Sequence, residues 1–261
     1  MKAACIVLSV ITAFPAVSFA DEWTKHWSSS GRPELHVTAG DSPLEIKYGP
    51  GEGIDAVIRT KGLAIGESGL RVQEHQSGNR IDLEIKEPSF HFNFHENHEI
   101  KVEVRVPRDL SAYLHTGDGP ISIEGVHGTI QAHSGDGPVK VEDFEGTLDA
   151  HTGDGPVTLQ GRFDDLRVQT GDGPVAITAQ HGSRILSGWH LQTGDGPVRL
   201  RLPSDLSANI ELHSGDGPIQ LDLPLTVSGS QDHHNVHGSL NGGGPQVTVH
   251  TGDGPITISR S

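Results

Sequence analysis

The sequence has little cysteine and few aromatic residues. Cys5 is the single cysteine among 261 residues, and it lies in the apolar stretch at the N-terminus. The chain beyond that stretch therefore has no disulfide, no thiol nucleophile and no thiolate metal site. Aromatic residues make up only 5% of the chain, whereas glycine occurs 34 times. This composition excludes a bulky globular core and favours thin, layered β-structure with many tight turns.

Basic residues and long apolar runs are also scarce. The sequence has 19 Lys and Arg against 34 Asp and Glu, which gives a formal net charge of −15. Such a surface repels polyanions, so we expect no nucleic-acid partner. Beyond the N-terminus no apolar run is long enough for a membrane span, so we expect none after signal cleavage.

Residues 1–20 have the pattern of a signal peptide. Lys2 supplies a positive start, an apolar run follows, and Ser18 and Ala20 place small residues at the −3 and −1 positions. We expect cleavage after Ala20 and an exported protein, periplasmic or extracellular. Cys5 lacks the flanking residues of a lipoprotein signal, so lipid anchoring is not expected.

The main signal is a repeated tetrapeptide, Gly-Asp-Gly-Pro, which we call the corner word. The first three steps between copies are 18 residues each, and the later steps are longer. A degenerate copy lies at 242–245 and an early echo at 40–43. The seven full copies lie at 117–120, 135–138, 153–156, 171–174, 194–197, 215–218 and 252–255.

Apolar residues alternate with polar ones on both sides of each corner word, a period of two that predicts strands. Around one copy, Leu148, Ala150 and Val157 fall on one face of the chain, and His151 falls on the other. Glycine tolerates positive φ, aspartate accepts hydrogen bonds from nearby amides in turns, and proline is suited to a strand start. The residues predicted to form structural corners are Gly117, Gly119, Pro120, Gly135, Gly137, Pro138, Gly153, Gly155, Pro156, Gly171, Gly173 and Pro174.

One repeat has too thin an apolar stripe to fold alone. Stacking repeats about 4.8 Å apart would create one continuous interior. We therefore predict an all-β fold, a right-handed β-solenoid of 18-residue coils over residues 111–261. A series of antiparallel hairpins is the alternative, because Gly-Asp-Gly also suits a hairpin turn. Val126, Phe144 and Phe163 are predicted to point inward at the second corner of each coil.

Residues 21–110 are predicted to be a more irregular continuation of the same β-structure. Trp23 and Trp27 are candidates for a cap over the first coil. Residues 228–241 lack periodicity and are predicted to be an inserted loop. The predicted N-terminal strands are centred on 35–37, 44–46, 56–58, 70–72, 81–85 and 100–106.

The aspartates of the corner words are predicted to form a column down one edge. Like charges at this spacing repel, so something must offset the repulsion. Hydrogen bonds from corner amides are one explanation, and a ladder of Ca²⁺ ions, which prefer carboxylate and carbonyl oxygens, is the other. The candidate ligands are Asp118, Asp136, Asp154, Asp172, Asp195, Asp216 and Asp253.

A second column of outward-facing residues precedes the corner words. Stacked imidazoles could bind a transition metal or become charged together below about pH 6. A solvent-facing polar ladder is the simpler interpretation, since glutamine replaces histidine twice. The column consists of His115, His133, His151, Gln169, Gln192, His213 and His250.

The sequence offers no distinct catalytic constellation. Each acid near the repeats is one of many equivalent copies, whereas an active site needs a unique cluster with perturbed acidity. His133 and Ser134 lie on opposite faces of a strand and cannot pair as base and nucleophile. We therefore expect no enzyme and no cofactor, with Ca²⁺ bound by the aspartate column as the alternative.

The chain resembles the bacterial "putative adhesin" family, a repeat-β domain of unknown function. The resemblance rests on Val104-Arg105-Val106-Pro107 and on the segment His115 to Ile123, and it covers roughly residues 30–258. It implies an adhesin-like or structural module that binds a protein or glycan of the cell envelope or surface. The alternatives are a calcium-binding β-roll-like protein and a scaffold that self-associates through the solenoid ends, of which the C-terminal coil is predicted to lack a cap.

Overall fold

The computed structural model describes residues 21–261 except 30, 68, 89–97, 225 and 228–233. The predicted signal peptide lies outside the described residues. These residues contain no helix long and apolar enough to cross a membrane. Their 21 strands are β1 (Asp21–Trp27), β2 (Glu34–Ala39), β3 (Leu44–Tyr48), β4 (Ile54–Lys61), β5 (Arg71–Ser77), β6 (Arg80–Lys86), β7 (Glu99–Val106), β8 (Asp109–Thr116), β9 (Ile121–Glu124), β10 (His127–His133), β11 (Val139–His151), β12 (Val157–Gln169), β13 (Val175–Ala179), β14 (Trp189–Thr193), β15 (Val198–Leu202), β16 (Ala208–Ser214), β17 (Ile219–Asp222), β18 (Thr226–Val227), β19 (Asn235–Leu240), β20 (Gln246–Thr251) and β21 (Ile256–Arg260).

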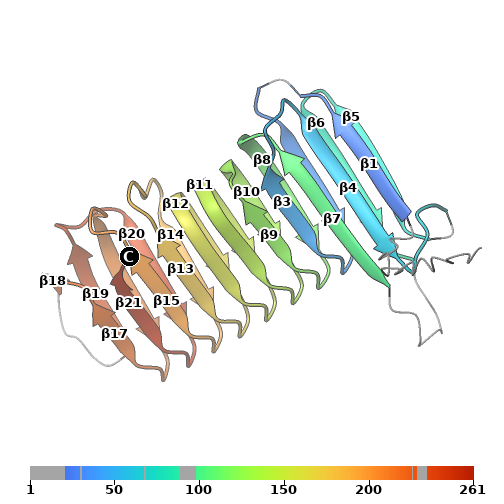
Figure 1. Cartoon of the computed structure of the whole chain (residues 1–261). Helices are drawn as coiled ribbons and strands as arrows, with labels where there is room; N and C mark the ends of the chain where they lie inside the picture. Colours follow the sequence, from blue (N-terminus) through green and yellow to red (C-terminus); the bar gives the residue numbers. More distant parts are fainter. Residues whose placement is uncertain (1–20, 30, 68, 89–97, 225, 228–233) are drawn as a thin grey trace, which may run out of the picture.

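The strands form two long ladders that lie back to back in an elongated, β-solenoid-like stack (Figure 1). We call the ladder β5-β6-β2-β8-β10-β11-β12-β14-β20-β16-β19-β18 the first face. The second face is β1-β4-β7-β3-β9-β11-β12-β13-β15-β21-β17. The 13-residue strands β11 and β12 run through both faces. Pairing is parallel throughout the middle of the stack, so the hairpin alternative is wrong there.

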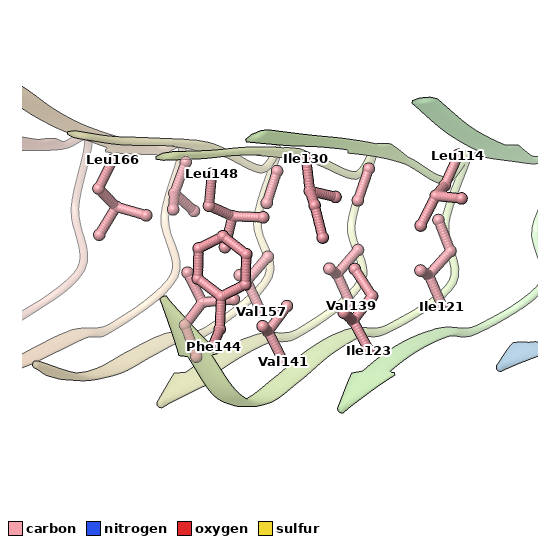
Figure 2. Packing of buried hydrophobic residues seen from close by; sticks show 14 of the residues in the cluster. Leu114, Ile121, Ile123, Ile130, Val139, Val141, Phe144, Leu148, Val157 and Leu166 are labelled. Carbon is pink, nitrogen blue, oxygen red and sulfur yellow. The ribbon is translucent and has the colours of Figure 1, made fainter. Parts of the chain in front are cut away.

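The hydrophobic core lies between the two faces. Figure 2 shows Ile130 and Leu148 of the first face pointing toward Val139 and Val157 of the second. The alternation predicted from the sequence is confirmed, because these side chains are at most 1% exposed. Each fully buried aliphatic side chain contributes about 1.5–3 kcal/mol to folding. The residues predicted at the second corner, Val126, Phe144 and Phe163, are also buried.

The coils do not stack in chain order at the ends. Coil β2/β3 lies between β6/β7 and β8/β9, and the last coil, β20/β21, lies between β14/β15 and β16/β17. The prediction that the C-terminal coil forms an uncapped end was therefore wrong. These coils all pair in parallel with their neighbours, so coils with matching apolar rows can become neighbours whatever their order in the chain.

Two edge strands close the N-terminal end of the stack. Trp27 on β1 is 2% exposed, and its Nε1 donates to Glu74 Oε2 on β5 at 3.0 Å. Lys25 Nζ on β1 lies 2.8 Å from the other Glu74 oxygen. Trp23 packs beside Trp27 and is partly buried against the core. Both tryptophans therefore lie on an edge strand at this end of the stack, and their role as a cap stays a prediction.

Part of the predicted loop 228–241 is a strand. β19 pairs antiparallel with β16 and so extends the first face by one strand beyond β16. Val236 and Leu240 on β19 are buried, 4% and 5% exposed. The sequence pattern of β19 is weak because Gly238 and Ser239 interrupt it. Residues 228–233 lie outside the described residues.

Candidate functional site

The corner aspartates are joined from coil to coil. Each corner word lies between a first-face strand and a second-face strand. Asp118 Oδ1 accepts a hydrogen bond from the amide of Asp136 at 3.1 Å, and Asp136 Oδ1 accepts one from Asp154 at 3.2 Å. Asp41 of the early echo joins the same row through the amide of Asp118 at 2.9 Å. The carboxylates thus accept hydrogen bonds from amides of the next coil. The predicted hydrogen bonds from amides of their own turn are therefore not the ones that the structure shows.

The same contacts continue to Asp172 and Asp195, at 3.1 and 3.2 Å. Asp253 and Asp216 follow, since coils β20/β21 and β16/β17 stack beyond β14/β15. The amide hydrogen bonds to Asp41, Asp118, Asp136, Asp154 and Asp172 are charge-assisted and offset repulsion along this part of the row. Among the described residues, no group of three or more His, Cys, Asp or Glu is placed to hold a metal ion. Calcium binding by the row stays a prediction.

The corner glycines were predicted to adopt positive φ, and this is wrong. They are needed because the coils approach closely at the corners. None of Gly135, Gly137, Gly153 and Gly155 has φ between +20° and +160°. A Cβ built at any of these positions would lie within 3.0 Å of a backbone carbonyl or of an aspartate oxygen of the neighbouring coil. The same holds at Gly117, Gly119, Gly171 and Gly173.

The corner prolines open the second-face strands. Since proline has no N–H, it contributes to the ladder through its carbonyl. The Pro138 carbonyl accepts from Ile121 N at 2.9 Å, and the Pro156 carbonyl accepts from Val139 N at 3.0 Å. Pro120 and Pro174 accept in the same way from Leu44 and Val157, both at 2.9 Å.

Sequence reasoning missed a row of buried hydroxyls beneath the corners. Thr152 Oγ1 donates to the carbonyls of Gly137 at 2.9 Å and Gly135 at 3.2 Å in the preceding coil. Ser134 and Thr170 make the same contacts in the coils on either side. The signal was present, since serine or threonine precedes every full corner word. The row, which we call the hydroxyl ladder, is Thr116, Ser134, Thr152, Thr170, Thr193, Thr251 and Ser214.

The predicted imidazole column lies on the first face, in register along the ladder. The rings of His133 and His151 stack with centroids 4.6 Å apart, and those of His213 and His250 are 4.7 Å apart. His151 Nε2 also lies 2.9 Å from Gln169 Oε1. Burial and the neighbouring His151 lower the pKa of His133. These contacts bring the column together as a stacked polar row.

Asp165 on β12 is a carboxylate that accepts several backbone hydrogen bonds from one connection. Its Oδ1 accepts hydrogen bonds from the amides of Leu186, Ser187 and Gly188 at 3.1, 2.7 and 3.2 Å. Burial alone would raise the pKa of Asp165, but the amides of Ser187 and Gly188 lower it. The carboxylate is therefore held ionised and fastens the connection between β13 and β14.

A groove of about 550 Å³ lies on the first face at the N-terminal end of the stack. It crosses strands β5, β6, β2 and β8, which contribute Gln73, Asp82, His36 and Tyr113, respectively. The Tyr113 side chain is 38% exposed, and its ring stacks with that of His36 at 5.6 Å between centroids. The remaining lining residues are Thr38, Glu74, His75, Arg80, Leu83 and Glu84.

The charged residues of this groove are paired with one another or with neighbouring strands. Arg80 donates to both oxygens of Asp82, the shortest contact being 2.8 Å. Hydrogen bonding to Arg80 lowers the pKa of Asp82, and hydrogen bonding to Lys25 lowers that of Glu74. Sequence reasoning missed the groove, because the β5–β6 hairpin pairs antiparallel at the edge of a parallel ladder.

The Toastrack DUF4097 family model matches residues 34–259, which is most of the chain. The chain belongs to the Toastrack DUF4097 family. The matched region includes all eight strands of the first face from β6 to β20 and every corner word. The groove on β2, β6 and β8 therefore lies within the Toastrack region. No curated protein matches the chain in sequence.

Two solved structures are similar to this Toastrack chain. One is described as a "putative cell adhesion protein" from Clostridium sporogenes ATCC 15579, with 16% identity, a TM-score of 0.46 and coverage of 92% of this chain and 99% of the other. The second is described as a "putative adhesin" from Bacteroides fragilis NCTC 9343, with 10% identity, a TM-score of 0.44 and coverage of 93% and 98%.

Proposed function

We propose that this chain is an exported, non-enzymatic binding module of the cell envelope or cell surface, adhesin-like in its role. The observation that carries the proposal is the groove on the first face, which combines an exposed ring with convergent polar groups. A concave site of this kind on a rigid scaffold is the usual form of a ligand site. The lining strands β6, β2 and β8 are each paired in the parallel ladder, so the site is fixed before a ligand arrives.

Two further features support a binding role over catalysis. The pKa values of the groove carboxylates Asp82 and Glu74 are lowered by their cationic partners, which keeps them ionised. A general acid at neutral pH needs the opposite shift. The stack also offers long flat faces on either side of the groove. We also propose that the chain is exported with loss of residues 1–20. We further propose that the coils of the stack are right-handed.

Cosedimentation with cell envelopes tests the proposal. The exported chain should begin at Asp21 by intact mass and should sediment with envelopes of the cells that produce it. Tyr113→Ala should reduce this sedimentation, whereas Tyr48→Ala, at the other exposed tyrosine, should not. Tyr48 is 42% exposed and lies on the second face, with Arg108 4.6 Å above its ring. Absence of sedimentation by the unmodified chain would refute the proposal.

A further inference from the structure

The charges of the groove satisfy one another. Each of the three carboxylates that line it lies beside a cation of the same molecule. Arg80 Nη2 lies 2.8 Å from Asp82, Lys86 Nζ lies 2.9 Å from Glu84, and Lys25 Nζ lies 2.8 Å from Glu74. A charged ligand would have to displace one of these partners. The groove therefore suits a ligand without net charge.

The groove nevertheless has a high density of hydrogen-bonding groups. Ionised carboxylates accept through several lone pairs, guanidinium donates in a planar fork, and the Gln73 amide does both. These groups retain free capacity after pairing, because a carboxylate offers about four acceptor positions. The ligand that uses them is rich in hydroxyl groups, which donate and accept at the same atom.

The Tyr113 ring adds an exposed apolar surface to this polar groove. Tyr113 and His36 stack with 5.6 Å between ring centroids and an interplanar angle of 26°, so the stack holds the Tyr113 ring in place while 38% of the residue stays exposed. Aromatic side chains contribute large contact area with little loss of conformational freedom. Sugar rings have an apolar C–H face and a polar hydroxyl rim, which match the exposed part of the Tyr113 ring and the surrounding polar groups.

We propose that the groove binds a neutral saccharide, with a sugar ring packed on Tyr113 and its hydroxyl groups bonded to Asp82, Glu84 and Gln73. This inference rests on the proposed envelope-binding function and names its ligand class. The groove volume of about 550 Å³ lies within the range of small-molecule sites and accommodates a short oligosaccharide. Binding should depend weakly on salt, since no ion pair forms with the ligand.

An array of neutral and acidic oligosaccharides, followed by calorimetric titration of the best neutral ligand, tests the inference. We expect neutral members to bind, with affinity reduced about tenfold or more by Tyr113→Ala. Tyr113→Phe keeps the ring and should retain most of the affinity, and Tyr48→Ala should match the unmodified chain. Thermal melts of all three variants show whether the fold is kept.

Competition separates failure of this inference from failure of the envelope-binding function. Excess neutral oligosaccharide should displace the chain from envelopes. If envelope binding depends on Tyr113 but neutral oligosaccharides bind neither in the array nor in competition, the saccharide assignment is wrong and the envelope-binding function stands. Binding of acidic members alone, with strong salt dependence, would also overturn the assignment. If the unmodified chain binds no envelope, both proposals fail.

Discussion

Replacing Thr152 by valine removes one rung of the hydroxyl ladder while keeping the β-branched shape. Thr152 is buried, and its hydroxyl donates to the carbonyls of Gly137 and Gly135 in the preceding coil at 2.9 and 3.2 Å. A buried polar group left without a partner costs about 1–3 kcal/mol. For a chain of this size, 1 kcal/mol shifts the melting temperature by about 2–4 °C. We therefore expect Thr152→Val to melt about 2–12 °C lower.

Thr158→Val is the matched control. Thr158 lies six residues further along, on β12, and faces solvent, and its hydroxyl makes no hydrogen bond to any described residue. Surface substitutions of this kind stay within about 0.5 kcal/mol. Thermal melts and urea unfolding should show a lower midpoint for Thr152→Val at an unchanged slope. Equal midpoints for the two variants would refute a stabilising role of the ladder.

Four other outcomes follow from the structure. Gly155→Ala should destabilise the chain by about 1–3 kcal/mol or more, because its Cβ meets a neighbouring backbone, whereas Gly51→Ala, where nothing lies within 4 Å, should be neutral in the same melts. The pKa of His133 is lowered in the folded chain, so its contribution to stability should be full above the ordinary histidine pKa of 6.5. This contribution should be lost as pH drops through the lower folded pKa. His133→Gln should therefore lessen the fall in the urea midpoint between pH 7.5 and pH 5. Deleting residues 246–261 removes an interior coil and should abolish cooperative unfolding by circular dichroism, while a loss confined to one end would contradict the insertion. Calcium should leave the melting temperature unchanged because amides already bond to the aspartate row, and a rise on titration would favour the calcium alternative.

Much of the fold could be predicted from local pattern. The period of two around the corner words places Leu148 and Ala150 inside and His151 outside, as the structure has them. This works because a strand exposes alternate residues to opposite faces whatever its neighbours are. The six strands predicted in residues 21–110 are also present.

The order of the coils at the ends could not be predicted in the same way. Coils with similar rows of apolar residues can pair with one another equally well, and the local sequence pattern does not indicate which coils become neighbours. The groove depends on this order, since Tyr113 of β8 lies beside His36 of β2, 77 residues earlier in the chain. The hydroxyl ladder, by contrast, was visible as a constant serine or threonine before each corner word.

The insertion of β20/β21 between coils made earlier in the chain affects how the molecule is completed. Until residues 246–260 are in place, β14/β15 and β16/β17 each lack the neighbour that they have in the finished stack. Completing the stack therefore requires pairing between segments that are far apart in the chain, and such distant pairing slows folding. Once formed, β20 and β21 are each paired on both sides, so releasing this coil breaks hydrogen bonds to two neighbouring coils at once.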